Sequence, residues 1–307
     1  MTIQISEQTE RHISKTQPEI FNNEKIDVQP LISRGWLRAI IGTIGALIMS
    51  GIIVVPLFLT GLIDFELFSS DAGGSVVGAG KNNTIMVYIA SNLGIIISIL
   101  LMRKYIDRKS ISSMGLNFNK RVFTGGLLWG AALLLAGFGI LYLFGAVTIE
   151  SFGTIPWLSY IALFAFVAIG EEVMVRGYLL SNLTDSMNKY WALLISSAVF
   201  SIMHFANDQI SVISAVNLLL AGLLLGIYTV HKRDLWFPIG MHFTWNFFQG
   251  PIMGFEVSGM PTHSVISQTV TGNPYLTGGE FGFEGSLILT ALMTLSTIYL
   301  HNKYKTK

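Results

Sequence analysis

The sequence predicts an all-α, polytopic membrane protein, and three observations lead to this prediction: its composition, its long apolar stretches and the distribution of its basic residues. Apolar residues make up 51% of the 307 residues and charged residues only 12%, whereas about 25% of the residues of an average soluble protein are charged. The mean hydropathy is +0.59. These values indicate a protein embedded in the lipid bilayer, and no nucleic-acid partner is expected.

The apolar stretches are long enough to cross a membrane. A helix needs ~20 apolar residues to span a hydrocarbon core ~30 Å thick, and the chain contains about eight such stretches. We therefore expect a mobile, polar cytoplasmic tail over residues 1–35, a polytopic domain with an intramembrane polar cavity over 36–302, and a basic cytoplasmic C-terminus over 303–307. The predicted transmembrane helices are residues 39–63, 84–102, 122–148, 156–183, 191–206, 210–230, 235–255 and 285–300.

The basic residues set the predicted orientation. When Lys and Arg are assigned to alternate ends of these stretches, all but two of the 19 fall at one end, while Lys81 lies at the other end and Arg176 lies within a stretch. Loops rich in Lys and Arg remain cytoplasmic, and the opposite orientation would require two basic loops to cross the membrane. We thus expect an integral protein of a bacterial cell membrane with cytoplasmic N- and C-termini.

The connections predict little folded structure outside the helices. Residues 64–83 and 256–284 are rich in Gly, Ser and Thr, and we expect them on the outer side as covers or linkers. Gly126 and Gly130 have the four-residue spacing that lets neighbouring helices approach closely, here within one molecule. No internal repeat is evident, which disfavours transporters built from inverted repeats. Nothing in the sequence indicates an oligomeric state.

The most informative residues are the charges inside the fourth apolar stretch. A charge at the centre of a membrane span costs roughly 2.5–3.5 kcal/mol, so Glu171, Glu172 and Arg176 indicate a functional site. Glu172 and Arg176 are four residues apart and therefore face each other on a helix as a supporting ion pair, for which a purely architectural role is the alternative. Glu171 is rotated by about 100° from Glu172, which leaves its carboxylate available as a general base.

Two further segments supply polar groups that complement this carboxylate. His204 follows Phe200 by one helical turn, and His242 lies on one helix face with Asn246. Taken singly, His204 is more typical of a packing residue, and a His/Asn pair can simply bond two helices. Together with Glu171, however, these residues form a set that can hydrolyse an amide: Glu171 and His204 hold and deprotonate a water, while His242 and Asn246 donate hydrogen bonds to the tetrahedral oxyanion.

The residues required by competing hydrolytic mechanisms are missing. The chain contains no cysteine, so a thiol nucleophile and a thiolate metal site are excluded. The sequence also has neither an HExxH zinc helix nor a GxSxG nucleophile turn. Asn207 and Asp208 follow His204, and the sequence favours a turn between helices over a place at the rim of the cavity.

Three ordered motifs resemble those of the CAAX protease and bacteriocin-processing family (CPBP, or Abi) of intramembrane proteases, which includes the Ras-converting CAAX endoproteases. The resemblance covers roughly residues 121–255, and it implies peptide-bond hydrolysis within the membrane. It also implies Glu171 as the base and His204 as its water-holding partner. The oxyanion site would consist of His242 and Asn246, and the ion pair of Glu172 and Arg176 would support it. The motifs are Glu171-Glu172-xxx-Arg176, Phe200-xxx-His204 and His242-xxx-Asn246.

The resemblance leaves the metal question open. Members of this family are often called metalloproteases, and His204, His242 and a carboxylate are residue types that ligate zinc. A water activated by glutamate needs no metal, and we favour this metal-independent chemistry without a cofactor, with zinc as the alternative. The polar cavity is expected to open toward the cytoplasmic half of the bilayer, although His204 lies near the outer end of its stretch.

The expected partners are the lipid bilayer and a membrane-associated peptide or protein substrate. The resemblance implies processing of peptides such as bacteriocins, or immunity to them, and a prenylated CAAX substrate is less expected in a bacterium. Two alternatives come from other classes. One is a non-proteolytic immunity or regulatory scaffold that keeps the motifs for architecture. The other, less favoured, is a proton-coupled transporter, because intramembrane Glu and His also serve proton relays.

Overall fold

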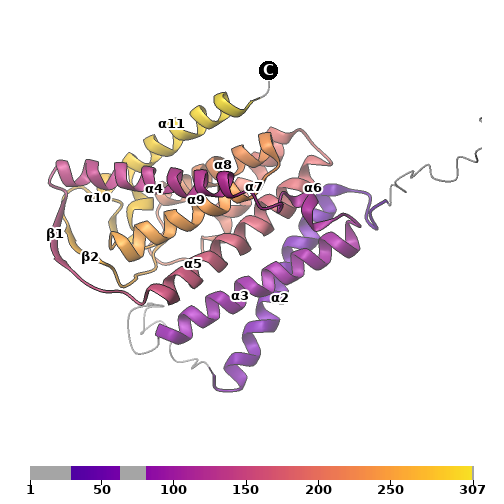
Figure 1. Cartoon of the computed structure of the whole chain (residues 1–307), viewed down its shortest axis with the longest axis horizontal. Helices are drawn as coiled ribbons and strands as arrows, with labels where there is room; N and C mark the ends of the chain where they lie inside the picture. Colours follow the sequence, from indigo (N-terminus) through magenta and orange to yellow (C-terminus); the bar gives the residue numbers. More distant parts are fainter. Residues whose placement is uncertain (1–28, 63–80, 306–307) are drawn as a thin grey trace, which may run out of the picture.

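The computed structural model describes residues 29–62 and 81–305, with the side chains of 81–83 excepted. The described chain is mostly helical (Figure 1), and a helix lies at each position where an apolar stretch predicts one. Three of the helices continue through π-helical segments. The helices are α2 (Gly35–Leu59), α3 (Lys81–Leu101) with η2 (Met102–Ile106), α4 (Lys120–Leu143), α5 (Trp157–Glu172) with η4 (Val173–Leu180) and α6 (Ser181–Thr184), α7 (Lys189–Met203), α8 (Val212–Lys232), α9 (Trp236–Phe247) with η5 (Phe248–Ile252), and α11 (Leu287–Tyr304).

Among the described residues, five helical segments are long and apolar enough to cross a membrane: those based on α2, α3, α4, α5 and α8. An integral membrane protein is therefore confirmed. The helix α7 is apolar but shorter, and neither α9 nor α11 meets the same criteria. A count of about eight transmembrane helices stays a prediction.

The all-α prediction is wrong at one end of the molecule. The third predicted stretch was expected to reach residue 148, but α4 ends at Leu143 and is followed by β1 (Val147–Phe152). This strand pairs antiparallel with β2 (Ile266–Val270), so that Val147 lies opposite Val270. The β-branched residues at the start of β1 favour an extended backbone, which explains the change from helix to strand.

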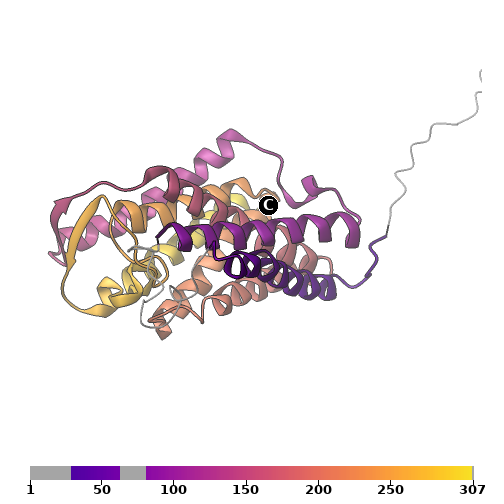
Figure 2. The same cartoon turned by 90° about the horizontal axis from the view of Figure 1, so that it is seen from below.

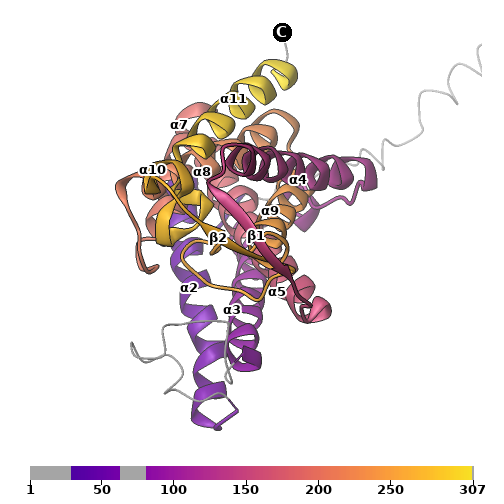
Figure 3. The same cartoon turned by 90° about the vertical axis from the view of Figure 1, so that its left-hand side faces the viewer.

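The second long loop is more structured than a linker. Besides β2, it contains three short helical turns, α10 (Pro274–Thr277), η6 (Gly279–Phe281) and η7 (Phe283–Gly285). Figure 3 shows β1 and β2 crossing the end of the helix bundle. The first long loop, residues 64–83, lies almost entirely outside the described residues.

The helices pack in neighbouring pairs. Helix α2 lies along α3 and helix α7 along α8 (Figure 2), while α4 lies against α9. The glycines of α4 permit this last contact, because a Cβ at Gly126 would overlap the Phe237 carbonyl, and one at Gly130 would overlap the Thr244 hydroxyl. The predicted close approach within the molecule is thus confirmed.

The two ends of the bundle differ in character. The start of α2, the segment after η2, α6 and the turn between α8 and α9 gather at one end, which we call the basic end because the Lys- and Arg-rich connections lie there. The β1–β2 pair, α10 and the turn between α7 and α8 lie at the opposite end, which we call the sheet end. The orientation of these ends in a membrane stays a prediction.

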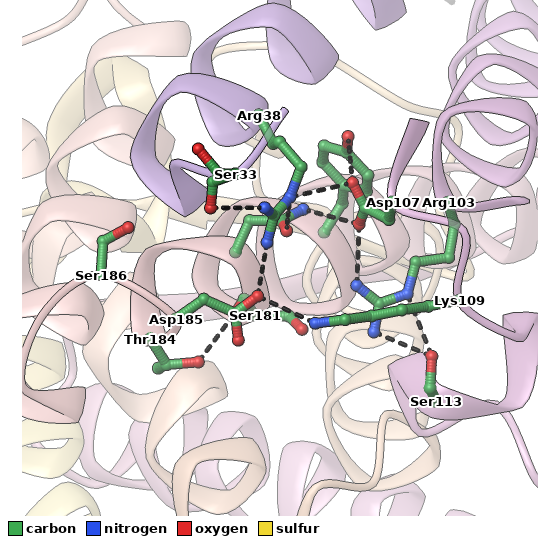
Figure 4. Close-up of polar contacts among 12 residues, drawn as sticks. Ser33, Arg38, Arg103, Asp107, Lys109, Ser113, Ser181, Thr184, Asp185 and Ser186 are labelled. Atoms are coloured by element: carbon green, nitrogen blue, oxygen red, sulfur yellow. Dashed lines mark hydrogen bonds and ion pairs between the residues drawn. The ribbon is translucent and has the colours of Figure 1, made fainter. Parts of the chain in front are cut away.

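A buried cluster of charges joins the elements of the basic end (Figure 4). We call it the clamp cluster. Asp107 follows η2, and its two carboxylate oxygens receive Arg38 of α2 and Arg103 of η2 at 3.2 and 2.9 Å. Asp185, just after α6, pairs with Arg38 and with Lys109. The clamp cluster comprises Arg38, Arg103, Asp107, Lys109, Tyr178, Asn182 and Asp185.

Candidate active site

The candidate site begins where α5 changes into the π-helical segment η4, directly after Glu172. Such π-helical insertions are frequent at functional sites because they re-aim side chains within a continuous helix. The preceding Gly170 lets α5 approach α3, since a Cβ there would overlap the side chain of Asn92. The two carboxylates therefore lie at an irregular position held tightly between helices.

Glu172 and Arg176 pair as their spacing predicts. Arg176 Nη1 donates to Glu172 Oε1 at 2.8 Å, and both side chains are buried. The guanidinium also donates to the carbonyl of Gly222 at 3.2 Å and lies 4.4 Å from the centre of the Phe200 ring. Buried charges are tolerated when paired and hydrogen-bonded in this way.

His242 of α9 lies between the two carboxylates. Its Nδ1 is 2.9 Å from Glu172 Oε1, while its Nε2 is 3.9 Å from Glu171 Oε2. A carboxylate oxygen accepts the Nδ1–H, so this contact fixes the orientation of the ring and places the proton of the neutral ring on Nδ1; an Nε2–H is present only in the imidazolium. The Nε2 atom is directed toward Glu171 and not toward the buried pair.

Glu171 retains unused hydrogen-bonding capacity. Its side chain is 20% exposed and lines a cavity of the described structure. Its Oε2 is buried but has no hydrogen-bond partner among the described residues. A buried carboxylate oxygen without a partner is costly, and such exceptions in a cavity call for a functional explanation.

His204 directly follows the last residue of α7, and the structure fixes which of its nitrogens faces outward. Its Nδ1 lies 2.8 Å from the carbonyl oxygen of Phe200, whose ring packs against it at 4.7 Å. Because a carbonyl only accepts, Nδ1 carries the proton, and the Nε2 of the neutral ring is an acceptor. His204 also lines the cavity, so it can accept a hydrogen bond from a water.

Asn246 completes the predicted set. It lies one turn after His242, is buried, and lines the same cavity. Its side-chain amide bonds to no residue of the described structure, which leaves its N–H groups available to a ligand. The structure therefore brings Glu171, His204, His242 and Asn246 to one cavity, with Glu172 and Arg176 directly behind them.

The cavity has a volume of about 320 Å³. Its lining combines apolar side chains with the predicted residues Glu171, His204, His242 and Asn246 and with the segments 206–208 and 257–261. These two segments belong to connections at the sheet end. The cavity thus extends toward the sheet end, in keeping with the position of His204 directly after α7. The opening toward the cytoplasmic half of the bilayer stays a prediction.

Asn207 and Asp208 lie in a turn, as the sequence favours, but they also line the cavity. Asn207 Nδ2 donates to the carbonyl of Ser258 at 3.0 Å. The same segment therefore forms the turn between the helices and part of the rim of the cavity, so the rim position that the sequence disfavoured is present as well.

The sequence reasoning missed one buried carboxylate of the cavity. Glu284 is only 7% exposed and accepts from Trp245 Nε1 at 3.0 Å and from both the N–H and the hydroxyl of Ser258 at 2.7 Å. The available signal was an acid placed directly before the last apolar stretch. Its partners are distant in sequence, so no local pattern connects them to it.

The arrangement of the His, Asp and Glu side chains decides whether the site can hold a metal ion. Among the described residues, no group of three or more His, Asp or Glu side chains is arranged to hold one. His204 and His242 each use Nδ1 in a protein hydrogen bond, which leaves one nitrogen apiece. A histidine that holds zinc typically hydrogen-bonds through its other nitrogen, so both histidines remain suitable ligands. Catalytic zinc also needs at least three converging protein ligands, and the described residues are not arranged to provide three.

Comparison with known proteins identifies one segment. Residues 153–248 match the family model described as "Type II CAAX prenyl endopeptidase Rce1-like". The matched segment contains all six predicted site residues and extends from just before α5 to the start of η5. No curated protein and no solved structure gives a match. The resemblance predicted from the three motifs is confirmed.

Proposed function

We propose that this protein is an intramembrane endopeptidase that uses a water activated by Glu171, because residues 153–248 match the family model described as "Type II CAAX prenyl endopeptidase Rce1-like". The observation that carries the proposal is that Oε2 of Glu171 has no hydrogen-bond partner among the described residues. This side chain lines one cavity together with His204, His242 and Asn246. A carboxylate of this kind can act as a general base that removes a proton from a bound water.

The attacking water is held by two acceptors. One of its protons is directed to Glu171 Oε2 and the other to Nε2 of His204, whose Nδ1–H is fixed by the Phe200 carbonyl. Glu171 removes the first proton as the water oxygen attacks the scissile carbonyl carbon. The same carboxyl group then returns this proton to the leaving amine, so that the carboxylate is regenerated.

The oxyanion is stabilised from α9. The imidazolium of His242 donates Nδ1–H to Glu172 and presents Nε2–H to the oxyanion, while Asn246 supplies a second donor from the next turn. Removing one such donor costs about 10²–10³-fold in kcat. Arg176 balances the charge of Glu172, which keeps that carboxylate in place as the support of His242. No step requires a metal ion.

The substrate is an extended peptide segment of a membrane-associated protein or peptide. The segment has to be extended because the scissile carbonyl of a substrate helix is engaged in its own backbone hydrogen bond, which must be released before the oxyanion donors can reach that carbonyl. We further propose that an isoprenoid group is not required, and that processing of, or immunity to, bacteriocin-like peptides is the biological setting.

The test is cleavage of a quenched peptide library by the purified protein in lipid, with and without a chelator. Wild type is expected to cleave, Glu171→Gln and His204→Ala to lose activity, and the chelator to have no effect. Cleavage by the two variants at the wild-type rate would overturn the catalytic assignment. Inhibition by the chelator that added zinc reverses would overturn the metal-independent mechanism. Preference for farnesylated over matched unmodified peptides would overturn the proposal about the isoprenoid.

The scaffold alternative is tested in the same samples. A scaffold would keep its cellular role in the Glu171→Gln variant at normal abundance, whereas a protease would lose it. Proton-driven solute uptake into proteoliposomes would favour a transporter. No observation in the structure favours either alternative.

A further inference from the structure

We propose that Glu284 is a positioning residue of the candidate protease site, where it holds a short turn over the cavity and thereby controls which extended peptides enter. We call residues 257–261 the roof turn. The inference rests on the proposed endopeptidase function for its activity readout, but its structural readout is independent of that function. Glu284 lies outside the segment matched by the family model, which ends at residue 248.

The roof turn is tight and forms one end of the cavity. Val257 and Met260 exchange backbone hydrogen bonds of 2.9 Å in both directions, and residues 257–261 all line the cavity. The two central residues, Ser258 and Gly259, have φ angles of 51° and 83°. Two successive residues with positive φ are typical of a type I′ turn. Glycine adopts this conformation freely, but serine pays a conformational cost.

Glu284 offsets the cost at Ser258. Its Oε2 accepts from both the backbone N–H and the hydroxyl of Ser258, each at 2.7 Å. The same carboxylate accepts from Trp245 Nε1 through Oε1 at 3.0 Å. Hydrogen bonds to a charged group are roughly twice as strong as neutral ones. Three of them therefore hold the roof turn and α9 to a single buried side chain.

The roof turn is also attached to the connection that follows His204. Asn207 Nδ2 donates to the carbonyl of Ser258 at 3.0 Å, and a Cβ at Gly259 would overlap the carbonyl of Asp208. On the opposite side, the N–H of Gly259 donates to the carbonyl of Phe281 at 3.1 Å. The turn thus bridges the wall that carries His204 and the segment that carries Glu284.

Trp245 connects Glu284 to the oxyanion residues. It lies between His242 and Asn246 in the sequence of α9, and its indole is fixed by the same carboxylate that fixes the roof turn. Glu284 is itself fixed, because its backbone carbonyl accepts from Asn217 of α8 at 2.7 Å. One side chain therefore sets the distance between the roof turn and the wall that binds the oxyanion.

The test uses Glu284→Gln, which keeps the shape but replaces one acceptor oxygen by an NH₂ group. Either the Trp245 indole or the Ser258 N–H then faces a donor, and one hydrogen bond is lost. The matched control is Glu280→Gln, which changes an exposed acid of the same segment. The chain has no cysteine, so Met260→Cys provides a single site at which a water-soluble maleimide reports how open the roof turn is.

In the Met260→Cys background, we expect Glu284→Gln to increase the labelling rate at least about tenfold over Glu280→Gln, while the unfolding temperature falls by only a few degrees. In the cleavage assay, Glu284→Gln raises KM and changes the order of preference among library peptides, and kcat for the best peptide falls less than KM rises. A uniform loss of activity that follows only the amount of folded protein would instead indicate a structural role and overturn the proposal.

A rescue variant keeps the inference falsifiable if Glu284→Gln folds poorly. Glycine at position 258 adopts a positive φ without help, so Ser258→Gly is expected to restore slow labelling and low KM to the Glu284→Gln protein. In the otherwise unchanged protein, Ser258→Ala loosens the turn and Ser258→Gly does not. Equal labelling in these two variants would overturn the inference. If wild type cleaves no peptide, the proposed function fails, while the labelling experiment still decides the role of Glu284.

Discussion

Two buried ionic clusters lie at different levels of this molecule, and they differ in how completely their carboxylates are satisfied. In the clamp cluster, Asp107 uses both oxygens: Oδ1 receives Arg38 and the Tyr178 hydroxyl, and Oδ2 receives Arg103 and Asn182. In the candidate site, the Oε2 atoms of Glu171 and Glu172 are buried without a hydrogen-bond partner among the described residues, although His242 Nε2 lies 3.9 Å from that of Glu171.

This difference distinguishes carboxylates that stabilise the fold from carboxylates that are available for catalysis. A fully partnered buried carboxylate can do nothing further without breaking contacts, and its role is to hold α2, η2 and η4 together. A buried carboxylate with a free oxygen beside a cavity stores an unsatisfied interaction that a substrate or water can complete. We infer that substitutions in the clamp cluster change stability, whereas substitutions in the site change chemistry.

The largest expected effect on stability comes from Asp107→Asn. This change leaves the Arg38 and Arg103 guanidinium groups buried beside an amide, and breaking a buried ion pair typically costs about 3–5 kcal/mol. We expect the free energy of unfolding in detergent micelles to fall by this amount. The rate of cleavage per folded molecule should remain at the wild-type value. A stable Asp107→Asn protein would show that the clamp cluster is dispensable.

Two asparagines, one in the candidate site and one in the clamp cluster, allow the same comparison with neutral side chains. Asn246→Ala removes a proposed oxyanion donor and should lower kcat about 10²–10³-fold without destabilising the protein, because its amide has no partner in the described structure. Asn182→Ala removes the partner of Arg38 and Asp107 and should show the opposite pattern. Parallel measurement of kcat and thermal unfolding decides this, and identical behaviour of the two variants would contradict the distinction.

A smaller effect is expected from tyrosine hydroxyls. Tyr178 donates to Asp107 at 3.1 Å, so Tyr178→Phe removes a hydrogen bond to a charged group, worth about 1.5–3 kcal/mol. Tyr160 accepts from the N–H of His263 at 2.8 Å, and Tyr160→Phe removes a neutral one, worth about 0.5–1.5 kcal/mol. Unfolding curves of both variants test the order. A larger loss of unfolding free energy for Tyr160→Phe than for Tyr178→Phe would contradict the stabilising role of the hydrogen bond to Asp107.

The smallest expected effect concerns pH and the start of α9. Burial raises the pKa of Asp234 above its ordinary value, although its Oδ1 accepts from the N–H of Trp236 at 2.7 Å. A raised pKa in the folded state adds stability below the unfolded pKa of about 3.9, and this contribution is lost as the pH rises through the folded value. The ionised carboxylate therefore carries a cost at neutral pH.

Asp234→Asn removes this cost but keeps an acceptor for Trp236, because Asn and Asp are comparable as helix caps. We expect the variant to be more stable than wild type by less than about 1 kcal/mol at neutral pH, with the difference disappearing near pH 4. Unfolding temperatures at the two pH values provide the measurement. A variant that is less stable at neutral pH would mean that the charge itself stabilises α9.

The sequence predicts the site better than it predicts the site's surroundings. Charges in an apolar stretch are visible without a structure because lipid makes them costly, and four-residue spacing identifies the pairs Glu172 with Arg176 and His242 with Asn246. These relations are local. The contact of His242 with Glu172 joins residues 70 positions apart, and only the motif order indicated that these segments meet.

The missed features depend on long-range contacts. Asp107 and Glu284 each look like an ordinary loop acid at the end of an apolar stretch, and burial becomes visible only when Arg38 or Trp245 is brought to them. The β1–β2 pair joins residues separated by more than 100 positions.

The distinction between the clamp cluster and the candidate site is best tested by comparing Glu171→Gln with Asp107→Asn, measuring both peptide cleavage per folded molecule and thermal unfolding in lipid. We expect Glu171→Gln to lose at least about 10²-fold in cleavage and to unfold at or above the wild-type temperature, while Asp107→Asn unfolds at a much lower temperature and cleaves normally when folded. Wild-type cleavage by Glu171→Gln, or a loss of stability equal to that of Asp107→Asn, would contradict it.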